Sequence, residues 1–309
     1  MILCFGTTPA VQRVMVFSSL SLNAVNRAVR TVESVAGKSL NVAKVLQQIG
    51  EFPVALTVLG GDRGAFLRQI MESKGLEMEA VEIASRTRQC VTLLDESAGT
   101  QTELVEESSP VSTAEVERLV EIATRRMQPA RCLVMSGTIA PGAPVGLYGR
   151  LTRLASDFGA ISVVDAQGEA LTEALKAEPG LVKPNVQELE ATVGRRLSGV
   201  SELMEAMREL THRGAKRVVV TAGKGAVLAF DGVYSWKIEP PSVKVVNPIG
   251  SGDAFTAGLV RSLVRGDDLG EACRWGAAAG TANALTLLAG EVERADVDRL
   301  AREVRVETV

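Results

Sequence analysis

The sequence is poor in residues on which several functional classes depend. Aromatic side chains make up 4% of the 309 residues, and there is a single histidine, His212. Because histidine catalysis requires an orienting partner and His212 lies in a polar helix end, we do not expect it to be catalytic. The four cysteines, Cys4, Cys90, Cys132 and Cys273, are scattered. Their spacing argues against a disulfide framework or a zinc site and is typical of reduced thiols in a cytoplasmic protein.

Two further absences restrict the partners. The formal net charge is −3, so the chain lacks the positive excess typical of nucleic-acid binding. No apolar run reaches the roughly 18 residues that a membrane span requires. Residues Met1–Gly6 have the pattern of a short strand rather than a signal peptide. We therefore expect a cytoplasmic protein whose partners are neither nucleic acids nor membranes.

Apolar, strand-like runs alternate with helical segments along most of the chain. The expected strands are Ile2–Phe5, Val54–Leu59, Cys132–Met135, Ile161–Asp165, Leu181–Lys183, Val218–Thr221 and Ala226–Phe230. The expected helices include Leu40–Ile49, Ala65–Lys74, Thr113–Met127, Pro144–Asp157 and Ser201–Arg213. This alternation predicts an α/β protein with a mainly parallel sheet and helices on both faces.

Two segments break this alternation. Residues Val11–Val35 and Arg86–Val105 each alternate like strands without a helix inside the segment, and the second has a turn around Gly99. They predict a small antiparallel sheet inserted into the α/β body. No linker or repeat divides the chain, so we expect a single domain over residues 1–309 with insertions at about 11–35 and 86–105.

The stretch around Asp253 carries the strongest chemical pattern. The pattern of Ser242–Val246 predicts an extended segment, and that of Ala254–Arg265 predicts a helix. Gly250–Asp253 would then form the turn at which the helix begins. The backbone N–H groups of such a turn are unpaired and lie at the positive end of the helix dipole. A carboxylate there would repel a permanently bound phosphate. It suits a phosphoryl group in transfer, with Asp253 accepting the proton of the attacking hydroxyl. A plain N-cap with a tight turn would use the same residues.

Residues 247–255, Asn-Pro-Ile-Gly-Ser-Gly-Asp-Ala-Phe, resemble the C-terminal signature of the PfkB sugar kinases in the ribokinase-like superfamily. The resemblance implies that Asp253 is the catalytic base and that the amides of Gly250, Ser251 and Gly252 form an anion hole. It also implies a ribokinase-like three-layer αβα sandwich. In that family the small sheet is a lid over the sugar and often a dimer surface.

Three more blocks resemble the substrate side of this family. Thr7–Gln12 resembles Asn-Pro-Ala-x-Asp but has Gln12 in place of the aspartate, and Ala36–Lys44 resembles Gly-Gly-Lys-Gly-x-Asn-Val-Ala but has Ala36 and Ser39 in place of glycines. Val25-Asn26-Arg27 and Arg88 match further positions. The resemblance implies that a phosphate on the substrate is bound by Arg27, Lys38 and Arg88. It implies that the sugar hydroxyls face Gln12, Gly37, Asn41 and Asp253. A solvated lysine at an ordinary helix start is the plain alternative for Lys38.

The nucleotide side is carried by later blocks. Asn185 and Glu188 lie three apart at a helix start, so they point to one side. The family uses this pair for water-bridged Mg²⁺ and phosphate contacts, and Lys183 for the ATP phosphates; a glutamate complementing a helix dipole is the plain alternative. The resemblance implies further nucleotide contacts from Thr221, Gly223, Gly225, Gly252, Ala277, Thr281 and Asn283.

Taken together, the resemblance implies ATP- and Mg²⁺-dependent phosphorylation of a phosphorylated ketohexose, and it leaves a monovalent cation open. Its nearest branch is the 1-phosphofructokinase and tagatose-6-phosphate kinase group, so the candidate substrates are fructose 1-phosphate, tagatose 6-phosphate and fructose 6-phosphate. One alternative is a kinase of an unphosphorylated sugar or nucleoside. Another, suggested by Gln12, Ala36 and Ser39, is a non-catalytic regulatory protein that binds sugar phosphates. A homodimer through the lid is also expected.

Overall fold

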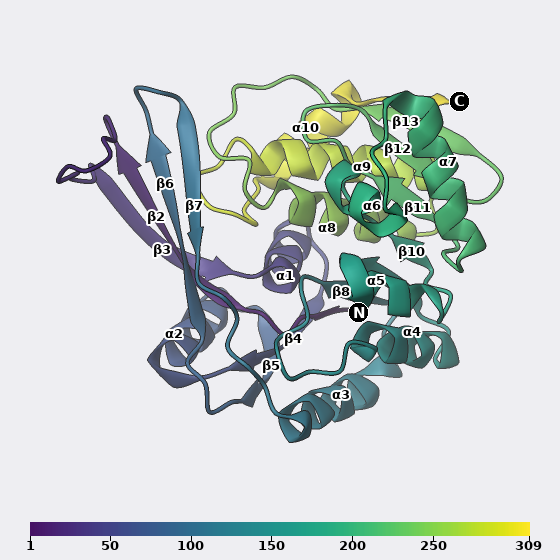
Figure 1. Ribbon diagram of the computed structural model, residues 1–309, viewed down its shortest axis with the longest axis horizontal. Helices are drawn as coiled ribbons and strands as arrows, with labels where there is room; N and C mark the ends of the chain where they lie inside the picture. The colour runs from purple at the N-terminus through teal and green to yellow at the C-terminus, as the bar shows by residue number, and fades with distance from the viewer.

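A large sheet runs through the middle of the computed structural model, which describes residues 1–309 (Figure 1). Its strands are β1 (Ile2–Phe5), β4 (Pro53–Leu59), β5 (Glu77–Glu82), β8 (Cys132–Ser136), β9 (Ile161–Asp165), β10 (Leu181–Val182), β11 (Val218–Val220), β12 (Val227–Phe230), β13 (Ser235–Glu239) and β14 (Arg305–Thr308). They lie in the order β14-β13-β12-β11-β10-β9-β8-β1-β4-β5. The strands from β11 to β5 are parallel, and β12, β13 and β14 extend the sheet in antiparallel fashion.

Helices cover both faces of this sheet, which makes the three layers that the sequence predicts. One face carries α1 (Lys38–Gln48), α2 (Gly61–Ser73), α8 (Ser251–Leu263), α9 (Leu269–Asn283) and α10 (Arg294–Glu303). The other carries α3 (Thr113–Met127), α4 (Leu147–Asp157), α5 (Gly168–Leu175), α6 (Val186–Val193) and α7 (Gly199–His212). None of these ten helices combines the length and hydropathy that a membrane span needs.

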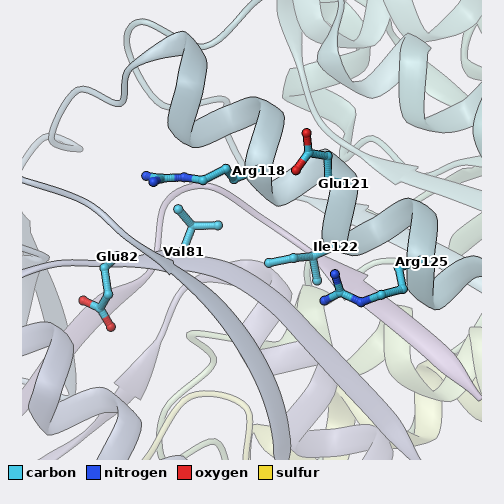
Figure 2. A pocket seen from close by; sticks show the side chains of 6 residues that line it. All are labelled: Val81, Glu82, Arg118, Glu121, Ile122 and Arg125. Atoms are coloured by element: carbon cyan, nitrogen blue, oxygen red, sulfur yellow. The ribbon is translucent and has the colours of Figure 1, made fainter.

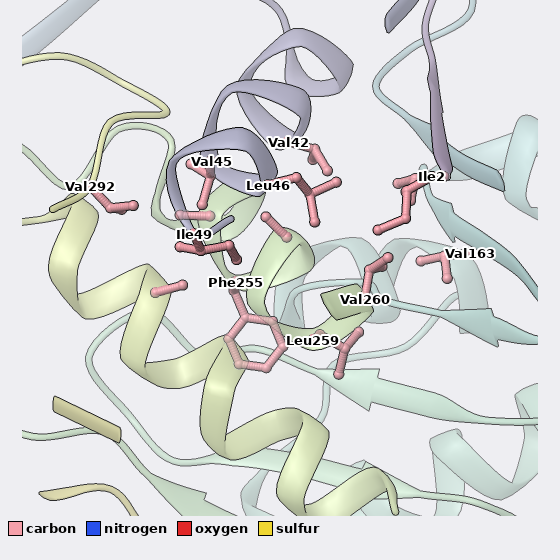
Figure 3. Packing of buried hydrophobic residues seen from close by; sticks show 14 of the residues in the cluster. Ile2, Val42, Val45, Leu46, Ile49, Val163, Phe255, Leu259, Val260 and Val292 are labelled. Atoms are coloured by element: carbon pink, nitrogen blue, oxygen red, sulfur yellow. The ribbon is translucent and has the colours of Figure 1, made fainter. Parts of the chain in front are cut away.

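The central strands are apolar throughout because both of their faces are buried. In β1, Ile2 and Cys4 point into one core, and Leu3 and Phe5 point into the other. Figure 3 shows the first core, where Phe255 and other side chains of α8 pack close to α1 and the sheet. This packing fixes the beginning of α8 relative to the strand ends.

The small sheet consists of β2 (Ala10–Phe17), β3 (Arg30–Ala36), β6 (Arg88–Asp95) and β7 (Thr100–Val105), in the order β3-β2-β6-β7. Both hairpins are antiparallel, and they join through β2 and β6, which run parallel. The sheet is therefore mixed, whereas the sequence analysis expected antiparallel strands. In Figure 1 it stands at the left of the molecule. β3 leads through Gly37 directly into α1, so the small sheet is covalently continuous with the body at this point.

Candidate active site

A cavity of about 400 Å³ lies between the small sheet and the carboxyl ends of β9, β10 and β11. In α/β sheets this edge is where ligands bind. Most of the residues singled out by the sequence analysis line the cavity, namely Gln12, Gly37, Lys38, Asn41, Arg88, Lys183, Asn185, Glu188, Thr221, Gly250, Gly252 and Asp253. The fold therefore brings together segments that are far apart in the sequence.

The turn at which α8 begins leaves backbone N–H groups without hydrogen-bond acceptors. Its N-cap, Gly250, has φ 85°, and no side chain caps the helix. A Cβ at Gly250 would lie 2.8 Å from the backbone nitrogen of Gly290, so only glycine suits the position. The Ser251 N–H donates to the Pro248 carbonyl, but those of Gly252 and Asp253 have no acceptor within the chain. Two free donors at a helix N-terminus form a site for an anion.

Asp253 lies beside these donors with its side chain 6% exposed. The Nδ2 of Asn41 donates to its Oδ2 at 2.8 Å. Burial raises the pKa of Asp253 to about 6, against the opposing charge of Lys38. A buried carboxyl with a pKa near neutrality, held by one hydrogen bond at the edge of a cavity, is suited to accept a proton from a bound hydroxyl.

Asp165, which the sequence analysis did not single out, organises the middle of the cavity. Its side chain is 1% exposed and lies between two ammonium groups, with Lys38 Nζ 3.4 Å from Oδ1 and Lys183 Nζ 3.3 Å from Oδ2. Burial by itself raises the pKa of Asp165, but Lys183 and Lys38 outweigh it and hold the pKa below its ordinary value. The sequence did carry a signal, since an acidic residue that ends a buried parallel strand lies at the ligand-binding edge.

Lys38 pairs with a second carboxylate besides Asp165. Its Nζ is also 3.6 Å from Oε1 of Glu188. The neighbouring Asp165 raises the pKa of Lys38 well above its usual value, so the side chain stays protonated. The resemblance groups Lys38 with Arg27 and Arg88; in the structure Lys38 lines the same cavity as Arg88 and shares Asp165 with Lys183.

Asn185 and Glu188 form a capping box at the start of α6. The Asn185 side chain accepts from the Glu188 backbone N–H at 2.9 Å, and Oε2 of Glu188 accepts from the Asn185 N–H at 2.8 Å. The cap uses the Asn185 amide oxygen, which leaves its Nδ2 without a partner, while Oε1 of Glu188 remains on the cavity side. The pair is therefore a helix cap, and the one carboxylate oxygen outside the cap, Oε1, faces Lys38.

The small sheet contributes polar groups whose hydrogen bonds are incomplete. Gln12 is 1% exposed; its Nε2 donates to the Thr92 hydroxyl at 3.1 Å, and its Oε1 has no partner. Arg88 donates to the Thr8 and Glu106 carbonyls, both at 3.2 Å, and its buried Nε is unpaired. Unpaired buried polar atoms that line a cavity are expected to meet a ligand or water. Cys90 and Glu103 also line this wall, and the sequence analysis missed both.

Several predicted residues lie outside the cavity. Arg27 is exposed in the loop between β2 and β3. Ser251, Gly223 and Gly225 are not among the lining residues. Ala277 and Thr281 are buried on α9, where the Thr281 hydroxyl donates to the Ala277 carbonyl at 2.8 Å.

Asn283, another of the predicted nucleotide contacts, is fully buried behind the α8 turn. It donates to the Ile249 carbonyl at 2.9 Å and accepts from the Gly290 N–H at 2.8 Å. Its side chain thus holds two loops together beside Gly250, and it is not among the residues that line the cavity.

A second hollow of about 420 Å³ lies between β5 and α3, away from all predicted site residues. Figure 2 shows that the charged ends of Glu82, Arg118 and Glu121 point in different directions. Arg125 is already paired with Glu79 at 2.8 Å. The side chains do not converge on one point, so the first cavity is the candidate site.

Comparison with known proteins identifies the family of the chain. A model of the pfkB family of carbohydrate kinases matches residues 1–293. A tagatose-6-phosphate kinase of Staphylococcus epidermidis is 28% identical over 309 residues, which cover 99% of both chains.

Solved structures show the same architecture. The phosphofructokinase-2 of Escherichia coli in complex with potassium is similar, with a TM-score of 0.91, 28% identity and 98% of each chain covered. The same enzyme has been solved with fructose 6-phosphate and in a tetrameric inhibited form. A possible 1-phosphofructokinase of Thermotoga maritima has a TM-score of 0.91 at 22% identity, covering 100% of this chain and 99% of its own, which shows likeness of fold.

Proposed function

Because the chain belongs to the pfkB family of carbohydrate kinases, we propose that it transfers the γ-phosphoryl group of ATP to a hydroxyl of a phosphorylated ketohexose. Fructose 1-phosphate, tagatose 6-phosphate and fructose 6-phosphate are the candidate acceptors. The observation that carries the proposal is the position of Asp253. Its buried carboxyl lies beside two free backbone N–H groups, in the same cavity as the unpaired atoms of Gln12 and Arg88.

The proposed mechanism follows from which groups are free. Asp253, ionised above a pH of about 6, accepts the proton of the acceptor hydroxyl as its oxygen attacks the γ-phosphorus. The bond between this phosphorus and the bridging oxygen to the β-phosphate breaks, and ADP leaves. The N–H groups of Gly252 and Asp253 stabilise negative charge on the moving phosphoryl group. Lys38 and Lys183 supply positive charge near the phosphates, and Asp165 holds both in place.

Glu188 is the residue we propose to hold Mg²⁺ through water. No cluster of three or more His, Cys, Asp or Glu side chains in this chain can hold a metal by itself. Mg²⁺ does not require such a cluster, because it keeps several waters and takes its remaining oxygens from substrate phosphates. One carboxylate oxygen, Oε1 of Glu188, is therefore enough on the protein side, whereas the oxygen of Asn185 is used by the helix cap. When bound, Mg²⁺ neutralises charge on the nucleotide phosphates.

Arg88 is the proposed partner of the phosphate already on the sugar. Its guanidinium lies on the small-sheet wall of the cavity, on β6 next to β2, the strand that carries Gln12. Arginine suits this role because its planar fork binds phosphate oxygens in pairs. The partly unpaired amide of Gln12 is placed to contact sugar hydroxyls.

A second candidate function is phosphorylation of an unphosphorylated sugar or nucleoside. It is favoured by one observation: Arg27 lies outside the cavity and Lys38 is already paired with carboxylates, which leaves Arg88 as the one arginine lining the cavity. Such an enzyme would not depend on Arg88 for acceptor binding.

ADP release distinguishes the two functions. We expect turnover with one or more of the three ketohexose phosphates, and little with free fructose, ribose or nucleosides. Arg88→Ala is expected to raise the KM of the phosphorylated acceptor by about 10- to 100-fold, the loss of a charge-assisted contact, with a smaller effect on the KM of ATP. Arg13→Ala, which removes an arginine paired with Glu33 on the exposed side of β2, is the matched control. An acceptor KM unchanged by Arg88→Ala would favour the second function.

The same ADP-release assay, run in potassium and in sodium salts, tests whether turnover depends on a monovalent cation.

We also propose that the small sheet forms a homodimer surface. Leu22 and Val25 are 95% and 83% exposed in the loop that also carries Arg27, and Leu104 is 53% exposed on β7. Large apolar side chains that stay exposed, here two in one loop and one on β7, are candidates for an interaction surface. Sedimentation velocity is expected to give twice the mass of one 32.7 kDa chain; a monomer at micromolar concentration would contradict the proposal.

A further inference from the structure

Lys44 is a buried cation that the mechanism above does not use. It lies on α1, three residues after Asn41, and is 1% exposed. Its Nζ donates to the Val35 carbonyl at 2.7 Å and to the Ala289 carbonyl at 2.7 Å. Both acceptors are backbone oxygens, one at the end of β3 and one in the segment between α9 and α10.

An ammonium group in such surroundings is costly. Burial lowers the pKa of Lys44 to about 8, only partly offset by the charges of Glu291 and Asp253. An apolar side chain of similar length would fill the same volume without this desolvation. What only the ammonium provides is a donor that binds two carbonyls at once and ties together the segments to which they belong.

Residues 289–290, which Lys44 binds through the Ala289 carbonyl, pack against the turn at which α8 begins. A Cβ at Gly250 would lie 2.8 Å from the nitrogen of Gly290 and 2.9 Å from the Cβ of Ala289. On its other side, a Cβ at Gly290 would lie 2.8 Å from Asn41. Asn41 in turn donates the hydrogen bond that orients Asp253. Residues 289–290 therefore fill the space between the N-cap of α8 and the residue that positions the proposed base.

We propose that Lys44 is a positioning residue for phosphoryl transfer. By binding the Val35 and Ala289 carbonyls, it holds residues 289–290 in place between Gly250 and Asn41. The position of residues 289–290 in turn fixes the orientation of Asp253 and of the free N–H groups of α8. The proposal rests on the proposed role of Asp253. Lys44 itself touches neither the cavity nor the reacting groups.

The test is Lys44→Met, which keeps the length of the side chain and removes the ammonium. We expect kcat to fall by about 10- to 100-fold, as for a small misplacement of reacting groups, while the KM of ATP changes by less than about threefold. Lys44→Arg, which restores a charged donor, is expected to recover part of the loss. Leu46→Ala, a cavity in the fully buried part of the same helix, controls for loss of stability and should leave kcat, measured well below its unfolding temperature, nearly unchanged.

A second readout separates positioning from a merely structural role. The Asn41 hydrogen bond lowers the pKa of Asp253, so a displaced Asn41 should move the acidic limb of the kcat/KM profile to higher pH. Lys38, Lys183 and Asp165 are unchanged in Lys44→Met, but the charge of Lys44 also acts on Asp253 directly. The same substitution is therefore made in an Asn41→Ala background, where the part of the shift that depends on the Asn41 hydrogen bond should be absent. An unmoved limb together with a kcat within about twofold of the unsubstituted protein would overturn the proposal. Lys44→Gln is the second uncharged variant; failure of both to fold would assign Lys44 to folding and would also overturn it.

Asp253→Asn, assayed in parallel, keeps the two failures apart. If Asp253→Asn is inactive and Lys44→Met is fully active, only the positioning role fails. If Asp253→Asn retains turnover, the proposed function itself fails.

Discussion

Burial of Asp253 works against the stability of the folded chain. A carboxyl whose pKa is raised from 3.8 to about 6 by burial binds its proton more tightly in the folded state than in the unfolded state. Its contribution to the free energy of unfolding is therefore favourable below about pH 4 and is lost as the pH rises through about 6. At neutral pH the ionised side chain costs about 2–3 kcal/mol.

Asp253→Asn should therefore stabilise the protein, but only where the aspartate is ionised. The asparagine oxygen can still accept from Asn41. We expect the variant to unfold at higher urea, by about 2 kcal/mol near pH 8, with the difference vanishing near pH 4. A variant that is less stable than the original at alkaline pH would contradict the burial of this charge.

At the scale of one element, the α8 turn offers two glycines with opposite steric requirements. A side chain at Gly250 would collide with residues 289–290 and would sit at positive φ, whereas a Cβ at Gly252 would meet only Lys183 Nζ, at 4.0 Å. Gly250→Ala should thus lower stability by about 1–3 kcal/mol. Gly252→Ala should fold normally and lower kcat, because the methyl group would stand in the anion site.

Thermal unfolding and ADP release together check this pair. The expected pattern is a lowered Tm for Gly250→Ala alone, and lowered kcat with an unchanged Tm for Gly252→Ala. A fully active Gly252→Ala would mean that no phosphoryl group approaches the α8 turn.

Two substitutions of Glu188 distinguish its role in the capping box of α6 from its proposed role in binding Mg²⁺. Glutamine at the third helical position can maintain a capping box, so Glu188→Gln should keep stability near that of the original. It removes the carboxylate charge, and we expect the Mg²⁺ concentration for half-maximal activity to rise about 10-fold or more.

Glu188→Ala is the matched variant, expected to lose about 1 kcal/mol of stability as well. If Glu188→Gln shows an unchanged Mg²⁺ dependence, then Glu188 is a helix cap and not a metal contact.

Elements could be predicted from the sequence where a continuous apolar run or a capping signal marks them. The interior strand β1 and the helix α3 match their predicted bounds, because continuous apolar runs and strong capping signals mark them. The edge strands β5 and β14 were missed. Their sequences, Glu-Met-Glu-Ala-Val-Glu and Arg-Val-Glu-Thr, are partly exposed and charged, so no apolar run distinguishes them from loops.

At the scale of the whole molecule, what the sequence could not provide is which distant segments meet. Motif matches identified Lys38, Lys183 and Glu188 separately, but not that Asp165 holds the two lysines or that Lys38 also faces Glu188. Arg27 shows the converse, since it matches a motif position but lies in an exposed loop outside the cavity. These relations depend on strand order and on the docking of the small sheet, which local patterns do not encode.

The central claim, that a buried carboxylate beside free helix amides drives phosphoryl transfer, is tested most directly by the turnover of Asp253→Asn. With ATP and the best ketohexose phosphate at saturation, we expect kcat to fall by about 10³-fold or more while the affinity for ATP changes by less than about threefold. Turnover within about tenfold of the original protein would contradict the claim, since the base would then be a different group.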